Sequence, residues 1–428
     1  MKIKTYVTSK YQEKSFDNID IKTNKDGLKI ALDTNKFYQT WLGFGGAFTE
    51  AACYNFLKLS PDKREEAIKD YFSESGLNYN LARIPMASSD FSISPFDYLE
   101  NGKLDYGRLD KYFVETYKMA KDYQEDLVFL VSPWSPPAFM KDNEKRNYGG
   151  KLKYEYYSDY ADYYISFLKH LINDLKVNVK YLSIQNEPAA TQTWDSCLYT
   201  PLEEFKLAKL LDARLKEEGM DIKILVWDHN RDIMVERLKP IYDLDKDNII
   251  YGGAIHWYDN EKFENLTVIH NLYPNKHILH TESCIEGGPH YNFYEGLERY
   301  ARNIIGDMNN YLEAYIDWNL YLDKDGGPNW VGNCCDAPIM IINENEYIKQ
   351  YSYYGIKHLA HFIKPGMKRI DIKIDNSDLV YTAFIDDKKT VIVLLNQTEN
   401  EYVVSLDENY KILPRSITTI VMEEDDGK

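Results

Sequence analysis

Short apolar runs that end in polar or glycine-rich sequence alternate with amphipathic stretches along the middle of the chain. The clearest run starts at Tyr181, where apolar and polar residues alternate before Asn186, Glu187 and Pro188. Such alternation is typical of a β-strand, and a proline cannot continue a central strand because it lacks the backbone N–H. We therefore expect Asn186 and Glu187 to lie at the carboxyl end of a buried strand.

Seven further apolar runs bring the number of predicted strands to eight. They cover residues 41–48, 81–85, 127–131, 222–227, 254–258, 277–282 and 314–319. Helical patterns separate the strands, over Pro61 to about Phe72, 107–122, 158–175, and from a capping box at Thr200 and Glu203 to Gly219. Eight strands that alternate with helices predict an α/β fold, the (β/α)8 TIM barrel.

The pattern changes after Lys364. From Arg369 to Met422 the chain shows period-two segments separated by turns, which predict an antiparallel β domain. Similar short segments occur in the first forty residues, such as 28–32, and we expect them to join this domain and cover its second face. The predicted domains are a (β/α)8 barrel over 38–364 and a β-sandwich-like side domain over 1–37 plus 365–428.

Composition narrows the class of protein. Among the 428 residues, 28% are charged and 44% hydrophobic, as in ordinary globular proteins. A formal net charge of −17 argues against nucleic acid or an anionic membrane as a partner, since both attract basic surfaces. No apolar run has the length of a membrane span. The oligomeric state is not indicated by the sequence.

Two features predict a cytoplasmic location. The sequence after Met1 is polar, without the apolar segment of a signal peptide, although a trimmed leader would give the same picture. The five cysteines are odd in number and form neither a disulfide framework nor a zinc pattern. Reduced thiols in a cytoplasm fit this usage.

Two glutamates stand at strand ends, where barrel enzymes carry their active sites. Glu187 follows the predicted fourth strand, and Glu282 ends the seventh. Hydrolysis of a glycosidic bond needs such a pair, one carboxyl group to protonate the leaving oxygen and one to attack or stabilise the anomeric carbon. We expect Glu187 to be the acid/base and Glu282 the nucleophile. The alternative for Glu187, when its motif is considered by itself, is a structural glutamate that caps the turn after the strand.

Neighbouring polar residues are expected to support the pair. Arg83 and Tyr258 are placed to hydrogen-bond Glu282 and keep it ionised, and Asn186 to hold a sugar 2-hydroxyl. The alternative for Arg83 is a salt-bridged core arginine, and for Tyr258 an ordinary core position.

Other candidates concern the sugar ring and metals. Trp318 is expected under the ring, with Asp90 and Trp134 at its outer hydroxyls, although a lone tryptophan is more often core. His256 and His229 lack the paired spacing of metal ligands, so we predict neither a metal site nor a cofactor. Cys284 lacks a histidine partner in the sequence pattern and is expected to be a buried structural thiol.

Several segments of the chain, taken together and in their order, resemble glycoside hydrolase family 30. The matching segments are Gly43–Glu50 (GFGGAFTE), Arg83–Met86 with Ser88–Ser92, Ser132–Pro137, Gln185–Pro188, His256–Tyr258, Thr281–Cys284, Asp317–Leu320, and Gly326–Val331 with Asn333. The resemblance implies a barrel with a β side domain, double displacement with retention, and the same roles for Glu187 and Glu282.

The glucosylceramidase branch is the most similar, because several residues match its sugar-contacting positions. These are Asp90, Trp134, Tyr258, Trp318 and Asn333. His256, beside Tyr258 in its motif, is expected to support the site. The resemblance implies an exo-acting enzyme that removes a terminal β-glucosyl unit from a small glucoside or glucolipid.

Alternatives remain at this stage. Three segments depart from the animal glucosylceramidase pattern: the loops over 191–197 and 228–231, and the pair Cys334–Cys335. The resemblance therefore leaves open which leaving group the enzyme prefers. β-1,6-Glucanase, β-xylosidase and β-fucosidase activities occur in the same family. Two alternatives differ in kind: an inverting enzyme, and a non-catalytic sugar-binding protein on the same barrel.

Overall fold

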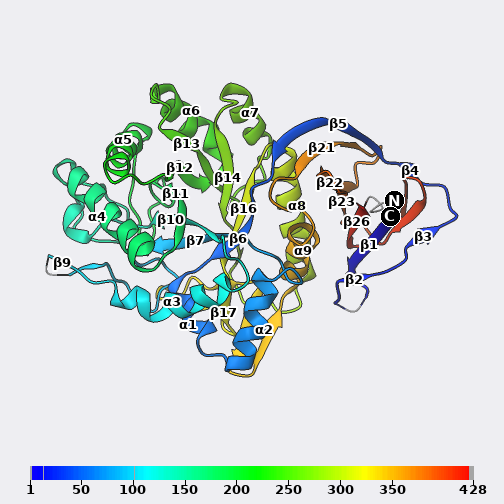
Figure 1. The fold of residues 1–428 in the computed structure, drawn as a ribbon, viewed down its shortest axis with the longest axis horizontal. Coiled ribbons are helices and arrows are strands. Elements are labelled where there is room, and N and C mark those ends of the chain that lie inside the picture. The colour runs from blue at the N-terminus through cyan, green and yellow to red at the C-terminus, as the bar shows by residue number, and fades with distance from the viewer. Residues whose placement is uncertain (1, 13, 101, 424–428) are drawn as a thin grey trace.

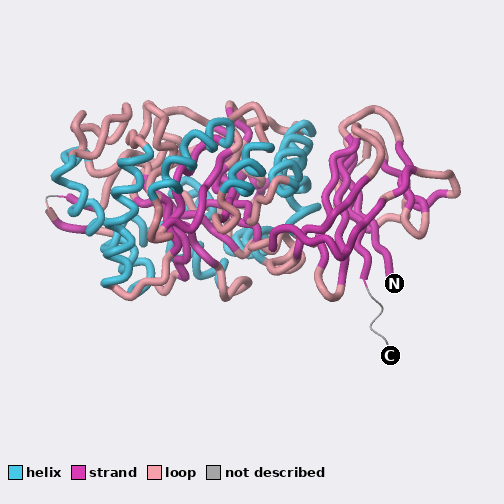
Figure 2. Tube along the Cα trace, turned by 90° about the horizontal axis from the view of Figure 1, so that it is seen from above, coloured by secondary structure: helices cyan, strands magenta, loops and turns pink. Residues whose placement is uncertain are grey.

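The fold is that of a computed structural model, which describes residues 2–12, 14–100 and 102–423. A barrel surrounded by helices occupies one side of the molecule, and a β domain occupies the other (Figure 1). Seen from above, the β domain consists of strands and loops, and the helices belong to the barrel side (Figure 2). No helix in the described ranges is long and apolar enough to cross a membrane.

Eight parallel strands close into a barrel, which confirms the predicted fold. In barrel order they are β6 (Gly43–Ala47), β7 (Leu81–Met86), β10 (Val128–Pro133), β11 (Asn178–Ser183), β12 (Lys223–Asn230), β13 (Ile250–His256), β14 (His277–Glu282) and β16 (Ala314–Asn319). β14 and β16 have the predicted bounds. The interior is filled by side chains such as Leu130, Leu225 and Leu279, so the barrel is a packed core and not a pore.

Helices cover the outside of the barrel (Figure 1). They are α1 (Glu50–Phe56), α2 (Pro61–Phe72), α3 (Gly107–Lys121), α4 (Tyr157–Lys169), α5 (Pro201–Glu217), α6 (Met234–Leu244), α7 (Glu264–Leu272), α8 (Tyr294–Asn309) and α9 (Tyr351–Ala360). The capping box between Thr200 and Glu203 is present at the start of α5. The helix expected over 158–175 is shorter: α4 ends at Lys169 and residues 170–174 form a π-helical turn.

One strand lies earlier than its apolar run suggested. β13 begins at Ile250 and ends at His256, whereas a strand over 254–258 was expected. Two glycines interrupt the apolar pattern. A Cβ at Gly252 would lie 2.1 Å from the carbonyl oxygen of His277, so the neighbouring strand β14 approaches too closely for any side chain here.

The side domain combines both ends of the chain, as predicted. Its larger sheet has the order β2 (Asp17–Asn18), β1 (Lys2–Ser9), β26 (Ser416–Glu423), β23 (Lys389–Asn396), β22 (Leu379–Ile385), β21 (Lys368–Lys373) and β5 (Ala31–Thr40). β1 pairs with β26 along its whole length. A second sheet has the order β3 (Lys22–Thr23), β25 (Asn409–Ile412), β24 (Tyr402–Ser405) and β4 (Leu28–Lys29).

Short strands shape the loops around the barrel. They are β8 (Leu99–Glu100), β9 (Lys103–Leu104), β15 (Ile285–Glu286), β17 (Tyr321–Asp323), β18 (Cys335–Asp336), β19 (Ile339–Asn343) and β20 (Glu346–Lys349). β15 pairs with β18, so the loop after β14 is fastened to the long loop that follows β17. These two loops form one wall of the pocket described next.

Candidate active site

Glu187 lies in a loop just after β11, in a strained backbone conformation. Its φ is +48°, in the left-handed region that few non-glycine residues adopt. The turn is held by its neighbours: Asn186 N donates to the Pro133 carbonyl (2.9 Å) and Glu187 N donates to the Asp228 carbonyl (2.9 Å). Such strain, held by the strands on either side, is typical of functional positions.

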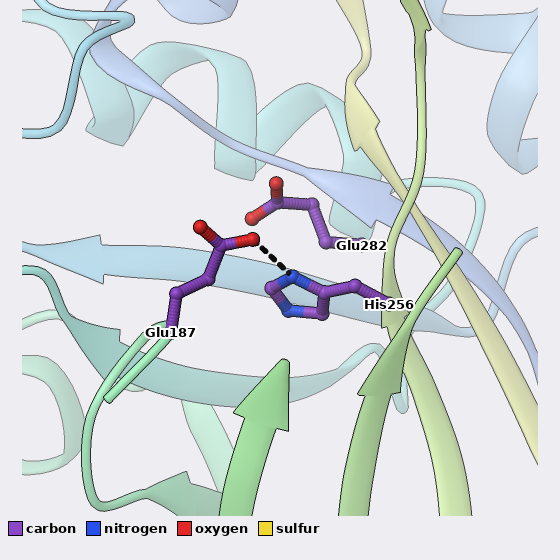
Figure 3. Close-up of side chains that lie close together, drawn as sticks. All are labelled: Glu187, His256 and Glu282. Carbon is purple, nitrogen blue, oxygen red and sulfur yellow. Dashed lines mark hydrogen bonds and ion pairs between the residues drawn. The ribbon is translucent and has the colours of Figure 1, made fainter. Parts of the chain in front are cut away.

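The two glutamates face each other across the barrel mouth. Glu282 is the last residue of β14, and Figure 3 shows its carboxyl group directed toward that of Glu187, with His256 beside them. One oxygen of each glutamate and one nitrogen of His256 lie within 4.8 Å of one another. The fold therefore brings together the two carboxyl groups that the sequence singled out.

Glu282 accepts a hydrogen bond on each oxygen. Arg83 Nη1 donates to Oε2 (3.2 Å), and the Tyr258 hydroxyl donates to Oε1 (3.1 Å). These are the two contacts expected from the sequence. Because an arginine and a tyrosine hydroxyl donate to a carboxylate, both contacts favour the ionised form of Glu282 and fix its orientation.

A buried ion pair lies beneath the pocket. Arg83 on β7 and Asp228 on β12 are fully buried, with Arg83 Nη2 2.9 Å from Asp228 Oδ2. Asp228 also accepts from the hydroxyls of Ser183 (2.6 Å) and Thr281 (2.6 Å). Burial acts to raise the pKa of Asp228, but Arg83 and His256 hold it well below its usual range. Arg83 also donates to Asn186 Oδ1 (2.9 Å), which orients that side chain.

Asp228 was given no role from the sequence. Its only signal was its place directly after an apolar strand run, which many surface residues share. The structure extends β12 through Asp228 with an irregular register at Trp227, and Asp228 has a φ of +48°. That bend turns its carboxylate toward Arg83 and His256.

His256 is clamped between two carboxylates. Its Nδ1 lies 3.1 Å from Glu187 Oε1 and its Nε2 lies 3.0 Å from Asp228 Oδ1. Carboxylates only accept, so both ring nitrogens carry protons. Burial lowers the pKa of His256, but Glu282, Asp228 and Glu187 together raise it to about 9. The ring is therefore an imidazolium at neutral pH.

The two glutamates differ in their titration. Burial acts to raise the pKa of Glu187, but His229 and His256 outweigh it and the pKa lies below its usual value. Burial raises the pKa of Glu282, and this exceeds the opposing effects of His256 and Arg83. These directions alone would place the proton on Glu282. The hydrogen bonds act against a proton on Glu282, since this carboxylate accepts from two donors, Arg83 and Tyr258, whereas among the described residues Glu187 has the single partner His256.

The remaining candidates form the walls of one pocket. The rings of Trp134 and Trp318 stack with centroids 5.1 Å apart. Asp90 accepts from Asn333 Nδ2 (3.0 Å) and from Asn329 Nδ2 (3.2 Å), which ties the loop after β7 to the loop after β17. Burial, followed by the charge of Glu282, raises the pKa of Asp90 to about 7. The cavity measures about 260 Å³.

Every sequence-predicted site residue lies at this pocket. Asp90, Trp134, Asn186, Glu187, Tyr258, Glu282, Trp318 and Asn333 line it, while Arg83 and His256 lie buried behind the two glutamates. The lining also includes Gln192, Trp194, His229 and Asn230, which the sequence did not assign to the site.

Metal binding and thiol chemistry are two other uses that such a pocket could have. A cation could contact Glu187, His256 and Glu282 at their spacing, but His256 would first have to lose a proton and its bond to Glu187. With a proton on each ring nitrogen, His256 already has a hydrogen-bond partner at both, and no such change is needed. Cys284 is buried, and its Sγ lies 3.4 Å from the Tyr258 hydroxyl, a setting that fits a structural thiol.

Comparison with known proteins assigns both domains of the chain to one family. Residues 41–363 match the glycosyl hydrolase family 30 TIM-barrel domain, and residues 366–420 match the family 30 β-sandwich domain. The chain belongs to glycosyl hydrolase family 30. It is a glycoside hydrolase, and the family resemblance expected from the sequence is confirmed.

Three similar proteins give the family context. Putative glucosylceramidase 2 of Caenorhabditis elegans is 31% identical, over 98% of this chain and 89% of that protein. The crystal structure of SrfJ from Salmonella typhimurium has a TM-score of 0.92 and 31% identity, covering 99% of this chain and 100% of that one. The endo-β1,6-glucanase BT3312 has a TM-score of 0.87 and 26% identity, covering 99% of each chain.

Proposed function

We propose that this family 30 enzyme is a retaining, exo-acting β-glucosidase. The observation that carries the proposal is the approach of Glu187 and Glu282, whose oxygens come within 4.8 Å. Retaining glycosidases hold their carboxyl groups about 5–5.5 Å apart, and inverting enzymes need about 6.5–9.5 Å to admit a water molecule. The close approach favours attack by a carboxylate on the sugar.

Glu282 acts as the nucleophile in this proposal. Its carboxylate attacks the anomeric carbon while the glycosidic C–O bond breaks, and Arg83 and Tyr258 keep it ionised and aligned. Glu187 gives its proton to the leaving oxygen and later takes one from the water that cleaves the glycosyl-enzyme ester. Before the first step the proton between His256 Nδ1 and Glu187 Oε1 moves to Glu187 and leaves His256 neutral, and the water of the second step then restores the proton of Glu187.

The shape of the pocket supports action on a terminal sugar. The hydrogen bonds from Asn329 and Asn333 to Asp90 join the loop after β7 to the loop after β17 beside the pocket. Its volume of about 260 Å³ lies below the roughly 300–1,000 Å³ of sites that hold drug-sized ligands. A terminal glycone with a short leaving group fits such a small pocket better than a continuous polymer. The similarity to putative glucosylceramidase 2 supports glucose as the glycone.

The roles of the glutamates are tested by two variants and two substrates. Glu282→Gln should lower kcat by at least about a thousandfold on every β-glucoside. Glu187→Gln should lower kcat/KM strongly only on substrates with poor leaving groups, because a dinitrophenyl group departs without a proton. Its kcat should fall on every substrate, because hydrolysis of the glycosyl-enzyme loses its base. The reverse pattern would exchange the two roles. Unchanged turnover in Glu282→Gln would remove it as the nucleophile.

A second candidate function is hydrolysis of β-1,6-glucan, favoured by the similarity to the endo-β1,6-glucanase. A matched panel of aryl β-glucoside, xyloside, fucoside and galactoside, together with β-1,6-glucan, separates the possibilities. Fast release from the glucoside supports the proposal. Another preferred sugar would keep both glutamates and change the glycone, and activity on the glucan alone would make the enzyme endo-acting. Calorimetric sugar binding without hydrolysis would indicate a non-catalytic protein.

A further inference from the structure

The loop that follows Glu187 carries an aromatic residue into the pocket. Trp194 is half-buried, lines the cavity, and packs against the cluster of buried side chains that includes Trp134 and Trp318. It belongs to the same loop as Glu187, the group that protonates the leaving oxygen in the proposed function. Trp194 therefore lies on the leaving-group side of the bond to be cleaved.

The backbone on either side of Trp194 is held in place. Gln192 accepts from Tyr148 N (2.8 Å) through its carbonyl. The buried Asp195 carboxylate accepts from Arg146 Nε (2.8 Å) and the Ser88 hydroxyl (2.7 Å). These contacts order a loop that would otherwise lose conformational entropy on binding. A preordered aromatic surface binds a ligand at a lower entropic cost.

His229 contributes a neutral donor to the same side. Its Nδ1 accepts from Asn230 N (2.7 Å), so the proton is carried by Nε2, and its ring stacks on Trp227. Burial lowers the pKa of His229, which keeps the ring uncharged at neutral pH. Its Nδ1 lies 4.0 Å from Glu187 Oε1. Across the part of the chain that the structure describes, no protein acceptor is found for Nε2–H.

We propose that Trp194 and His229 form a subsite for a leaving group that is itself a sugar. The C–H face of a pyranose ring packs on Trp194, and a ring hydroxyl accepts the hydrogen of His229 Nε2. This inference rests on the proposed function, because it takes Glu187 as the proton donor. The polar residues Gln192 and Asn230 beside Trp194 suit a sugar, whereas a lipid chain would need an apolar lining.

The test uses two substrates that share the glycone. β-Glucosyl fluoride releases a single fluoride ion and leaves the proposed subsite empty, whereas a β-1,4- or β-1,6-linked glucose disaccharide fills it. Trp194→Ala should lower kcat/KM for the disaccharide by about tenfold, chiefly through KM, and change the fluoride by less than about twofold. Trp194→Phe, which keeps an aromatic face, should give an intermediate value.

Tyr154→Ala is the matched control. Tyr154 is an aromatic residue with 80% exposure that does not line the pocket, so both substrates should behave as in the unaltered enzyme. Equal losses on both substrates in Trp194→Ala would mean a structural role and overturn the inference. So would a larger loss on a glucosyl lipid than on the disaccharide, which would identify a lipid leaving group. An unaltered enzyme that cleaves neither substrate would overturn the proposed function, and the inference with it.

Discussion

At the scale of single residues, the proton on His256 gives the site a second buried cation beside Arg83. Arg83 and His256 are cationic, and Asp228, Glu187 and Glu282 surround them. A buried cation costs free energy unless it is paired, and here each of the two contacts two carboxylates. The protonated ring therefore contributes to the stability of the fold as well as to the supply of a proton.

This contribution predicts a dependence of stability on pH. The pKa of His256 is raised from 6.5 to about 9, so its stabilisation is fully present below pH 6.5 and is lost as the pH rises through 9. Relative to His256→Gln, the unaltered protein should lose roughly 3 kcal/mol of unfolding free energy across this range. Urea unfolding of both proteins at several pH values measures the difference.

A second histidine provides the control for this experiment. Burial lowers the pKa of His270, so any stabilisation that it gives is lost only as the pH falls below its usual value of 6.5. The difference between the unaltered protein and His270→Gln should be constant between pH 7 and 9. A constant difference for His256→Gln as well would show that the ring is neutral in the folded protein.

Single residues also show how far the sequence can predict the site. Glu187, Glu282 and Arg83 could be placed because each stands in or directly after a recognisable strand run. Asp228 has the same position but gains its partners from a bend in β12, and Trp194 lies in a loop without periodicity. Loops take their shape from distant contacts such as Arg146 with Asp195, which no local pattern records.

At the scale of elements, helix α5 depends on its capping box. Thr200 Oγ1 accepts from Glu203 N, and Glu203 Oε2 accepts from Thr200 N (2.7 Å). Thr200→Ala should lower the free energy of unfolding by about 1 kcal/mol, because one backbone N–H at the helix start loses its partner. Thr193→Ala, at an exposed loop threonine, should change it by less than about 0.5 kcal/mol. Equal effects in urea unfolding would contradict the role of the cap.

Other helices and strands show which element boundaries can be predicted from the sequence. α2 begins at Pro61 and ends at Phe72 as expected, because a proline start and a nearby glycine are local signals. β11 begins three residues before its predicted start, at Asn178, because exposed Lys180 interrupts the apolar run. The π-helical turn after Lys169 follows from its tertiary surroundings, and helical periodicity does not reveal it.

At the scale of the whole molecule, one hydrophobic cluster extends from the barrel into the side domain, which also has a second cluster of its own. Phe384 of β22 packs with Trp41 at the start of the barrel (ring centroids 6.0 Å apart), and both belong to the cluster that fills the barrel's outer layer. Polar contacts cross the same boundary: Asn309 Nδ2 of α8 donates to the Tyr381 carbonyl (2.8 Å). Helices α8 and α9 lie between the two parts (Figure 1). A continuous core couples the folding of both parts.

This coupling predicts a single unfolding transition that a side-domain substitution shifts as a whole. Phe384→Ala should destabilise the protein by about 3–5 kcal/mol, because Phe384 is fully buried and its loss leaves a cavity at the boundary. Phe37→Ala, on strand β5 of the same sheet with 51% exposure, should cost less than about 1 kcal/mol. Scanning calorimetry distinguishes the outcomes: one peak lowered in temperature supports a shared core, whereas two peaks, of which only one moves in Phe384→Ala, would mean that the barrel folds independently of the side domain.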